Sequence, residues 1–467
     1  MKFTQSIFAA AFAFAAAAAF AAPVTTQGVG VGKHGDIQVA VTFDNGKIQK
    51  IDILKNAENP VLAKKVFTDL KDQIVAANSV QLDGISGATF TSKGLFAAVE
   101  DAAKKAGVTL GQADKKALKA AVKDLPKNAS YDVVVIGAGG AGFSAAIEAK
   151  NAGATVVLLE KMPQVGGNSL ISGAEMNAAK NWVQPKLGIT DDSPELHAKD
   201  TYLGGDKKGD MKVINVMTHN ALAGAEWCRD YLGVRFEPDN LFFFGGHSRK
   251  RALIPVGHTG TEFITKFQAK ADELGIPVIT NMKAEELIKD KSGRVVGVKA
   301  TMNGAEYTFN AKGGVVLATG GFGANPAMVK KYNPKIDERF KTTDAPGTTG
   351  EALYMAQRAG AELVNMQYIQ TYPICDPISG VIELIADARF DGAIMLNQEG
   401  KRFVEELGRR DVLSEAILDQ TGGYCWVLWN DKIGAVSNTV KEHPTEYDAF
   451  TKQGIMTTCP DLKCIAD

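Results

Sequence analysis

The feature that most constrains the fold is a strand, a glycine turn and a helix in direct succession. The apolar run Val133–Ile136 predicts a buried parallel strand, and a Gly-x-Gly-x-x-Gly turn follows at once, from Gly137 to Gly142. Such a turn leads into a helix whose N-terminus binds a pyrophosphate. A second apolar run, Thr155–Leu159, ends at Glu160, near the distance expected for a carboxylate that binds a ribose. The segment therefore predicts a βαβ unit that binds a dinucleotide, whereas a lone glycine motif with a surface charge at Glu160 would predict much less.

A different phosphate-binding signature lies upstream, in the run Asp83–Ser92 (DGISGATFTS). Gly84 and Gly87 allow backbone conformations that a side chain forbids, so a phosphate can approach the main-chain amides. The run resembles the FMN-binding domain in which the phosphate of FMN is esterified to the threonine of a Ser-Gly-Ala-Thr sequence, here Thr89. The resemblance implies covalent FMN, and the alternative from the residues alone is an ordinary glycine turn before a helix.

From Ala129 onward the chain resembles the FAD-dependent soluble fumarate reductase and flavocytochrome c family. Beyond the first glycine turn, the runs Gly166–Asn177, Ala318–Phe322 and Gly347–Glu351 carry the resemblance. Glu160 suits the ribose of FAD and of NAD equally, and these runs favour non-covalent FAD. The resemblance implies that FAD contacts Gly137, Gly139, Ala141, Gly142, Glu160, Asn168, Ser169, Ala174, Ala284 and Glu351. At the last of these positions the family usually has aspartate.

The same resemblance implies a catalytic arginine and a proton relay. Arg410 matches the family's proton donor, and Arg389 matches an arginine of its relay. A structural ion pair with Asp411 or Glu406 is the alternative for Arg410.

Departures from the fumarate pattern predict the substrate. Tyr372 replaces a histidine, Glu175 replaces a glycine, and the relay glutamate falls on Ala386 with Asp387 beside it. We expect an extended stretch here, in which a shift by one residue turns the Asp387 carboxylate to the other face, toward the substrate. Two carboxylates suit a substrate with one carboxylate and an imidazole N–H, and they would repel a dicarboxylate. The pattern resembles the urocanate-reducing members of the family, which form dihydrourocanate (imidazole propionate). Fumarate, methacrylate or an aryl acrylate are the alternatives.

Length and composition fit a large α/β enzyme. The chain has 467 residues, 45% of them hydrophobic, and a formal net charge of −1, which predicts no nucleic-acid partner. The predicted fold class is α/β: a doubly wound FAD-binding domain with an inserted cap domain, preceded by a small α+β FMN-binding domain. The expected segments are a signal peptide at 1–21, the FMN-binding domain at 27–108, a helical connector at 109–129, the FAD-binding domain with a substrate-side insertion at 130–423, and the start of the cap at 424–467.

The N-terminal segment predicts export. Lys2 precedes an apolar run from Ile7 to Phe20, and Ala19-Phe20-Ala21 matches a cleavage site for a signal peptide. The run is too short for a comfortable membrane span, so a retained anchor is the weaker alternative. The expected location is periplasmic.

The cysteines are few for so long an exported chain: Cys228, Cys375, Cys425, Cys459 and Cys464. No Cys-x-x-Cys-His run occurs, so neither c-type haem nor a metal site is expected. Cys459 and Cys464 could pair, but we expect core thiols.

The FMN domain stands where flavocytochromes c carry haems. The resemblance therefore implies a membrane-anchored, quinol-oxidising cytochrome as electron donor and an FMN transferase for maturation. Family members continue beyond the segment matched here, with parts that close the FAD site. A non-catalytic FMN electron carrier is therefore a second hypothesis beside a reductase of urocanate or a related 2-enoate.

Overall fold

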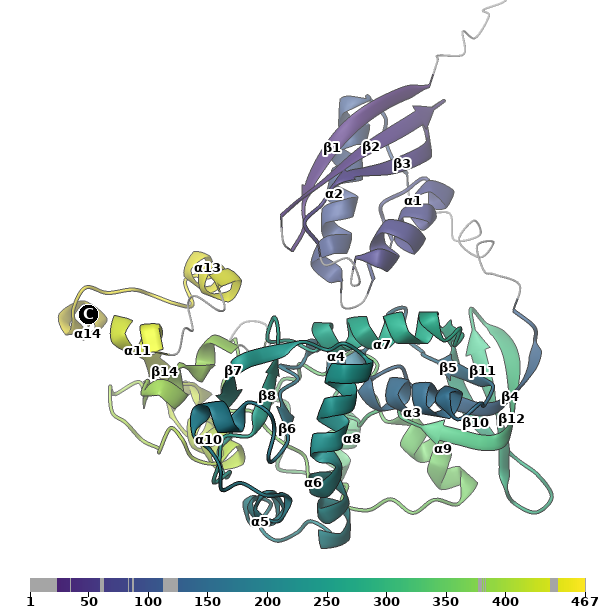
Figure 1. The fold of residues 1–467 in the computed structure, drawn as a ribbon. Helices are drawn as coiled ribbons and strands as arrows, with labels where there is room; N and C mark the ends of the chain where they lie inside the picture. The colour runs from purple at the N-terminus through teal and green to yellow at the C-terminus, as the bar shows by residue number, and fades with distance from the viewer. Residues whose placement is uncertain are drawn as a thin grey trace, which may run out of the picture. The chain divides into compact units, whose positions relative to one another are not determined.

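The computed structural model describes residues 23–33, 35–58, 63–82, 84–85, 88–111, 125–376, 380, 382, 384–436 and 444–466. The chain divides into two compact units, residues 1–124 and residues 125–467 (Figure 1). The expected signal peptide and residues 112–124 of the expected connector lie outside the described residues.

The first unit is a small α+β module built on a three-stranded antiparallel sheet of order β1-β2-β3. Its elements are β1 (Val24–Val31), β2 (Asp36–Asp44), β3 (Lys47–Lys55), a π-helical turn (Val66–Leu70), α1 (Lys71–Ala77) and α2 (Thr89–Lys105). Asn45 and Gly46, both at positive φ, form the β2–β3 turn, as expected for an Asn-Gly pair between two strands. Helix α2 packs against β1 so closely that a Cβ on Gly28 would lie 1.9 Å from the carbonyl oxygen of Ala98.

The second unit is built on a six-stranded sheet of order β10-β11-β12-β4-β5-β9. These strands are β4 (Asn128–Ile136), β5 (Val156–Leu159), β9 (Val278–Ile279), β10 (Lys283–Lys289), β11 (Val295–Met302) and β12 (Ala305–Leu317). Strand β4 pairs in parallel with β12 and β5, and β5 pairs in parallel with β9. The parallel core and its crossover helix α3 (Gly140–Asn151) confirm the predicted α/β class.

The chain between β5 and β9 leaves this sheet and forms a second, three-stranded sheet of order β6-β8-β7. Its elements are α4 (Gly167–Ile171), β6 (Met176–Asn177), η3 (Gln184–Leu187), α5 (Pro194–Gly204), α6 (Met211–Glu226), η4 (Trp227–Tyr231), β7 (Phe236–Phe242), β8 (Ala252–Pro255) and α7 (Thr261–Glu273). Side-chain caps fix two of these helices, because Ser193 accepts a hydrogen bond from the Leu196 amide and Asp210 accepts one from the Lys212 amide.

The remaining elements follow β12 and are short: α8 (Pro326–Tyr332), α9 (Glu351–Ala359), η5 (Leu384–Asp391), β13 (Ile394–Leu396), α10 (Arg410–Leu418), η6 (Thr421–Gly423), β14 (Trp426–Leu428), α11 (Asp431–Val436), α13 (Pro444–Gln453) and α14 (Leu462–Ala466). Cys459 and Cys464 form a disulfide, so our expectation of core thiols is wrong. Cys464 is exposed, and none of the described side chains of α14 is buried, so this helix offers the thiol no core to join. No helix in the described part of the chain is long and apolar enough to cross a membrane.

A buried ion cluster stabilises the inserted sheet. The Arg251 guanidinium, 1% exposed, donates to both carboxylate oxygens of Asp192 at 3.0 and 2.8 Å and to Asp200 at 2.7 Å. The Nδ1 atom of His247 lies 3.0 Å from the same guanidinium, and His197 lies beside His247 with ring centroids 5.7 Å apart. Burial and the charge of Arg251 lower the pKa of His197 to about 4 and lower the pKa of His247 as well.

These histidines predict an acid-labile insertion. The unfolded chain binds protons at a His pKa of about 6.5, whereas folded His197 stays neutral down to about pH 4, so stability falls as pH drops through this window. We expect His197→Gln to flatten this dependence in urea unfolding measured from pH 7 to pH 4. His219→Gln is the matched control, because His219 is exposed on α6. An unchanged pH dependence in His197→Gln would contradict the assignment.

Candidate active site

The first glycine turn lies where three strands end together. Ile136 of β4 is opposite Leu159 of β5 and Leu317 of β12, so the carboxyl ends of these strands share one edge. Gly137 has φ +101°, and a Cβ on it would lie 2.4 Å from the carbonyl oxygen of Ala318. At the start of α3, a Cβ on Gly142 would lie 1.8 Å from the carbonyl oxygen of Gly137. Only glycine fits, and the helix N-terminus that results faces the edge where a dinucleotide binds.

Glu160 anchors this turn. Its side chain is 9% exposed, and its carboxylate accepts hydrogen bonds from the amides of Ala138 at 2.9 Å and Met162 at 2.8 Å. Each oxygen takes one N–H, which leaves lone pairs for the hydroxyl groups of a ribose. These residues therefore fit the adenosine half of FAD. Gly139 caps α3 in an extended conformation, and Ala141 is exposed in the first turn of that helix.

The second glycine loop contacts the first. The hydroxyl of Ser169 accepts a hydrogen bond from the Gly140 amide at 3.1 Å, at the start of α3. The side chain of Asn168 accepts from the Ala345 amide at 2.6 Å and donates to Asp344. Ala174 takes a left-handed conformation, φ +58°, which turns the chain toward β6. The two loops that carry predicted FAD contacts are thus joined directly by a hydrogen bond.

Glu351 lies at the first position of α9, after Gly350 at φ +79°. Its carboxylate accepts hydrogen bonds from Lys161 at 2.9 Å and from the hydroxyl of Thr349. Partial burial raises the pKa of Glu351, but these two hydrogen bonds outweigh it and bring the pKa down to about 2. The carboxylate is therefore charged at any physiological pH. Ala284 lies on β10 opposite Ala300 of β11.

The predicted catalytic arginine, relay arginine and tyrosine come together. The guanidinium carbon of Arg389 lies 5.7 Å from the centroid of the Tyr372 ring, and that of Arg410 lies 5.0 Å from it. Arg389 is 2% exposed, donates to the carbonyl oxygen of Glu406 at 3.3 Å and stacks over Phe390 at 4.3 Å. Its Nε has no hydrogen-bond partner among the described residues. At these distances each guanidinium cation is attracted to the electron-rich face of the aromatic ring.

The carboxylates that might neutralise Arg410 are occupied by other arginines. Asp411 pairs with Arg409, at 2.7 Å to Nε, and Glu406 pairs with Arg402, at 2.9 Å to Nε. The hydrogen bonds from Arg402 lower the pKa of Glu406 to about 2. Arg410 itself makes no ion pair or side-chain hydrogen bond among the residues that the structure describes. Its guanidinium is half-buried and available to an anion.

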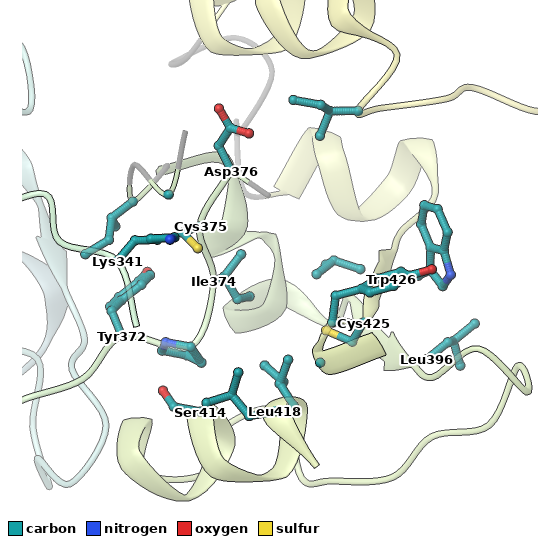
Figure 2. Close-up of a pocket in the computed structure, with 18 of the residues that line it drawn as sticks. Lys341, Tyr372, Ile374, Cys375, Asp376, Leu396, Ser414, Leu418, Cys425 and Trp426 are labelled. Carbon is teal, nitrogen blue, oxygen red and sulfur yellow. The ribbon is translucent and has the colours of Figure 1, made fainter. Parts of the chain in front are cut away.

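Tyr372 and Arg410 line a wide cavity of about 2980 Å³ between the loops after β12 and the C-terminal helices. Figure 2 shows Tyr372 and Lys341 on one wall, with Ser414 and Leu418 of α10 on another and Trp426 of β14 on a third. The C-terminal segment 424–465 contributes much of the lining.

The predicted carboxylates are less well placed. Glu175 is half-buried, and its two oxygens lie 2.5 and 2.6 Å from where a Cβ on Gly173 would stand. Among the described residues, Glu175 is not part of the lining of the cavity that Tyr372 and Arg410 share. Asp387 lies in the 3-10 helix η5, not in an extended stretch, so our expectation of alternating faces is wrong: successive residues of such a helix are about 120° apart. The side chain of Asp387 lies outside the described residues.

Thr89 is the first residue of α2. Its side chain, with Asp83, Ser86 and Gly87, lies outside the described residues. The cap residue Ala88 supplies no side-chain hydrogen bond, and the first intrahelical bond joins the Ser92 amide to Ala88. The amides before Ser92 have no intrahelical acceptor, so they fit a phosphate.

Comparisons of the chain with known protein families and proteins agree with this geometry. Residues 132–460 match the FAD binding domain family, and residues 32–104 match the FMN-binding domain family. The chain is 42% identical to urocanate reductase of Eggerthella lenta over 86% of this chain and 67% of that protein. It is 35% identical to fumarate reductase (cytochrome) of Shewanella frigidimarina over 75% of this chain and 59% of that protein.

The chain belongs to a family of FAD-binding flavoprotein reductases. Among solved structures, the open conformation of a flavocytochrome c3 fumarate reductase matches with a TM-score of 0.60 and 31% identity, over 72% of this chain and 58% of that one. The chain therefore spans about three fifths of the length of the two fumarate reductases. Its FMN-binding domain precedes the FAD-binding domain that the family shares.

Sequence reasoning missed two features of this flavoprotein fold. Lys161 was not singled out, yet its ammonium donates hydrogen bonds to both Thr349 and Glu351. Asp344 was not singled out, although its carboxylate contacts Asn168 and fills the space beside Gly323. Both contacts join segments more than 170 residues apart, and no local pattern marks them.

The close approach at the first turn predicts the effect of a single methyl group. We expect Gly142→Ala to lose FAD and to lower the free energy of unfolding by about 1–3 kcal/mol, because its Cβ overlaps the Gly137 carbonyl. Gly204→Ala is the control, since a Cβ there meets nothing within 4 Å. The flavin-to-protein ratio and thermal unfolding measure both. Full FAD content in Gly142→Ala would contradict this geometry.

Proposed function

We propose that this flavoprotein reduces the side-chain double bond of urocanate to give dihydrourocanate. The observation that carries the proposal is the pair of arginines over Tyr372, with Arg410 left without a carboxylate partner. An unpaired, half-buried guanidinium attracts the carboxylate of an enoate and stabilises the charge that develops during its reduction. When bound, FAD supplies the hydride, as in other flavin enzymes.

Arg410 is the proposed proton donor to the carbon next to the one that receives the hydride. Arginine holds its proton tightly, so its proton must be replaced through a relay as it leaves. Arg389 is the proposed next member, since its buried guanidinium faces the same tyrosine ring and has an unpartnered Nε. Glu406 is unsuited to pass protons, because Arg402 holds its pKa near 2.

Glu175 and Asp387 are the proposed acceptors for the imidazole ring. A carboxylate there favours a substrate that donates an N–H and disfavours a second substrate carboxylate. The chain is also 32% identical to an NADH:acrylate oxidoreductase of Vibrio harveyi over 94% of this chain and 49% of that protein, so an acrylate is the second candidate substrate. Fumarate is disfavoured by Tyr372 together with these two acids. The FMN electron carrier without alkene reduction is the second class of function, and it predicts little bound FAD.

The proposed electron route runs from a membrane-anchored, quinol-oxidising cytochrome to FMN on Thr89 and from there to FAD, in the periplasm. An FMN transferase would form the phosphoester. The match to an FMN-binding domain and the uncapped start of α2 at Thr89 support the placing of FMN at Thr89.

A substrate panel tests the proposal. The protein is purified with both flavins, reduced by a dye donor, and offered urocanate, fumarate, acrylate and an aryl acrylate. We expect urocanate to exceed fumarate by about tenfold or more in kcat/KM, because mispaired buried polar groups cost about 1–3 kcal/mol. Faster reduction of another enoate would replace urocanate as the substrate. Absence of FAD and of all turnover would favour the electron carrier.

Neutralising Arg410 tests its role. We expect Arg410→Gln to lower kcat for urocanate by about a hundredfold or more while FAD stays bound, which is the usual effect of removing a general acid. Arg409→Gln is the matched neighbour, because Arg409 is exposed and pairs with Asp411 and Asp206. Retained turnover in Arg410→Gln would remove this residue from the acid role.

Replacing Thr89 tests the FMN attachment. Thr91 is 4% exposed and bonds Glu58, while Ser92 is 0% exposed and bonds both the Ile85 amide and the Ala88 carbonyl. These hydroxyls are therefore poor acceptors of a phosphoester. We expect Thr89→Ala, made with an FMN transferase, to lack the mass of covalent FMN. Covalent FMN in that variant would overturn the assignment.

A further inference from the structure

Lys161 contacts Glu351, one of the residues that FAD is expected to meet. It follows Glu160 directly in the chain, and its ammonium donates to Glu351 at 2.9 Å and to the Thr349 hydroxyl at 2.6 Å. The Lys161 side chain is 25% exposed and that of Glu351 is 49% exposed. The contact thus joins the end of β5 to the start of α9 across the edge where the dinucleotide binds.

Three carboxylates lie at or beside the predicted FAD contacts. Glu160 and Glu351 are predicted FAD contacts themselves, and Asp344 contacts a third one, Asn168. The pyrophosphate of FAD brings further negative charge. Lys161 is therefore the cation that the structure pairs with this group, among the described residues. Without it, Glu351 would repel an anionic ligand in a partly desolvated site.

We propose that Lys161 is a cofactor-positioning residue: it neutralises Glu351 and holds the loop 342–351 closed over FAD. The loop is tied at its other end as well, where the Ala345 amide donates to Asn168 at 2.6 Å. Between the two ties, a Cβ on Gly347 would lie 2.8 Å from the Cγ of Met162, so the loop packs directly on the residue after Lys161. Loss of the Lys161 tie frees one end of the loop and leaves Glu351 charged.

The experiment measures FAD affinity in the whole protein. FAD is removed, the apoprotein is dialysed to equilibrium against known FAD concentrations, and non-covalent FAD is released by acid and quantified apart from covalent FMN. We expect Lys161→Met to weaken FAD about ten- to a hundredfold, the range for a lost charged hydrogen bond. Lys299→Met is the matched control, because Lys299 pairs with Glu286 at 2.8 Å on the exposed β10–β11 edge, and exposed pairs contribute little.

The double variant Lys161→Met with Glu351→Gln separates neutralisation from simple loss of structure. Glu351→Gln alone reports what Glu351 itself contributes to FAD binding. If Lys161 acts by neutralising Glu351, Lys161→Met costs little affinity in the Glu351→Gln background, and its loss in the wild-type background shrinks at high salt. An equal loss in both backgrounds overturns the proposal, as does Lys161→Met with wild-type affinity. Both results leave the substrate assignment intact, because wild-type reduction of urocanate is measured independently.

Discussion

The site depends on a contact between backbone atoms, where Gly142 packs on the carbonyl of Gly137 and Gly137 packs on the carbonyl of Ala318. No side chain fits in either gap, so the carboxyl ends of β4 and β12 and the start of α3 close to one edge. Glu160 then fixes the turn from β5 through the amide of Ala138. Every predicted FAD contact on the two glycine loops takes its place from this arrangement.

Charge pairing decides which cations are available for chemistry. Arg402 is held by Glu406 and Arg409 by Asp411, each through a two-point hydrogen bond. Arg251 is held in the same way within the inserted sheet. Arg410 stands next to these pairs in sequence yet outside them, so its charge is directed to whatever occupies the cavity beside Tyr372. The same logic assigns Lys161 to the cofactor cleft, where its partner Glu351 would otherwise oppose an anion.

Local patterns predicted the parts of this fold that local physics determines. The dinucleotide turn follows from glycines between an apolar strand and a helix. Features set by long-range packing were not predicted from the sequence. The Arg251 cluster joins residues 51 and 59 apart, and nothing near Asp192 or Asp200 marks a buried partner. The stretch around Asp387, which we expected to be extended, is a 3-10 helix. The thiols of Cys459 and Cys464 pair at the surface because the core does not extend to α14. The grouping of Arg389, Tyr372 and Arg410 came from family resemblance, and the structure brings the three together.

A structure of the FAD-bound protein with urocanate would test directly whether Arg410 and Tyr372 bind this substrate. We expect the urocanate carboxylate to lie within hydrogen-bond distance of the Arg410 guanidinium, with the Tyr372 ring beside the ligand. We expect the imidazole to be directed to Glu175 or Asp387. Urocanate bound elsewhere in the cavity, or Arg410 turned away and paired with a protein carboxylate, would contradict it.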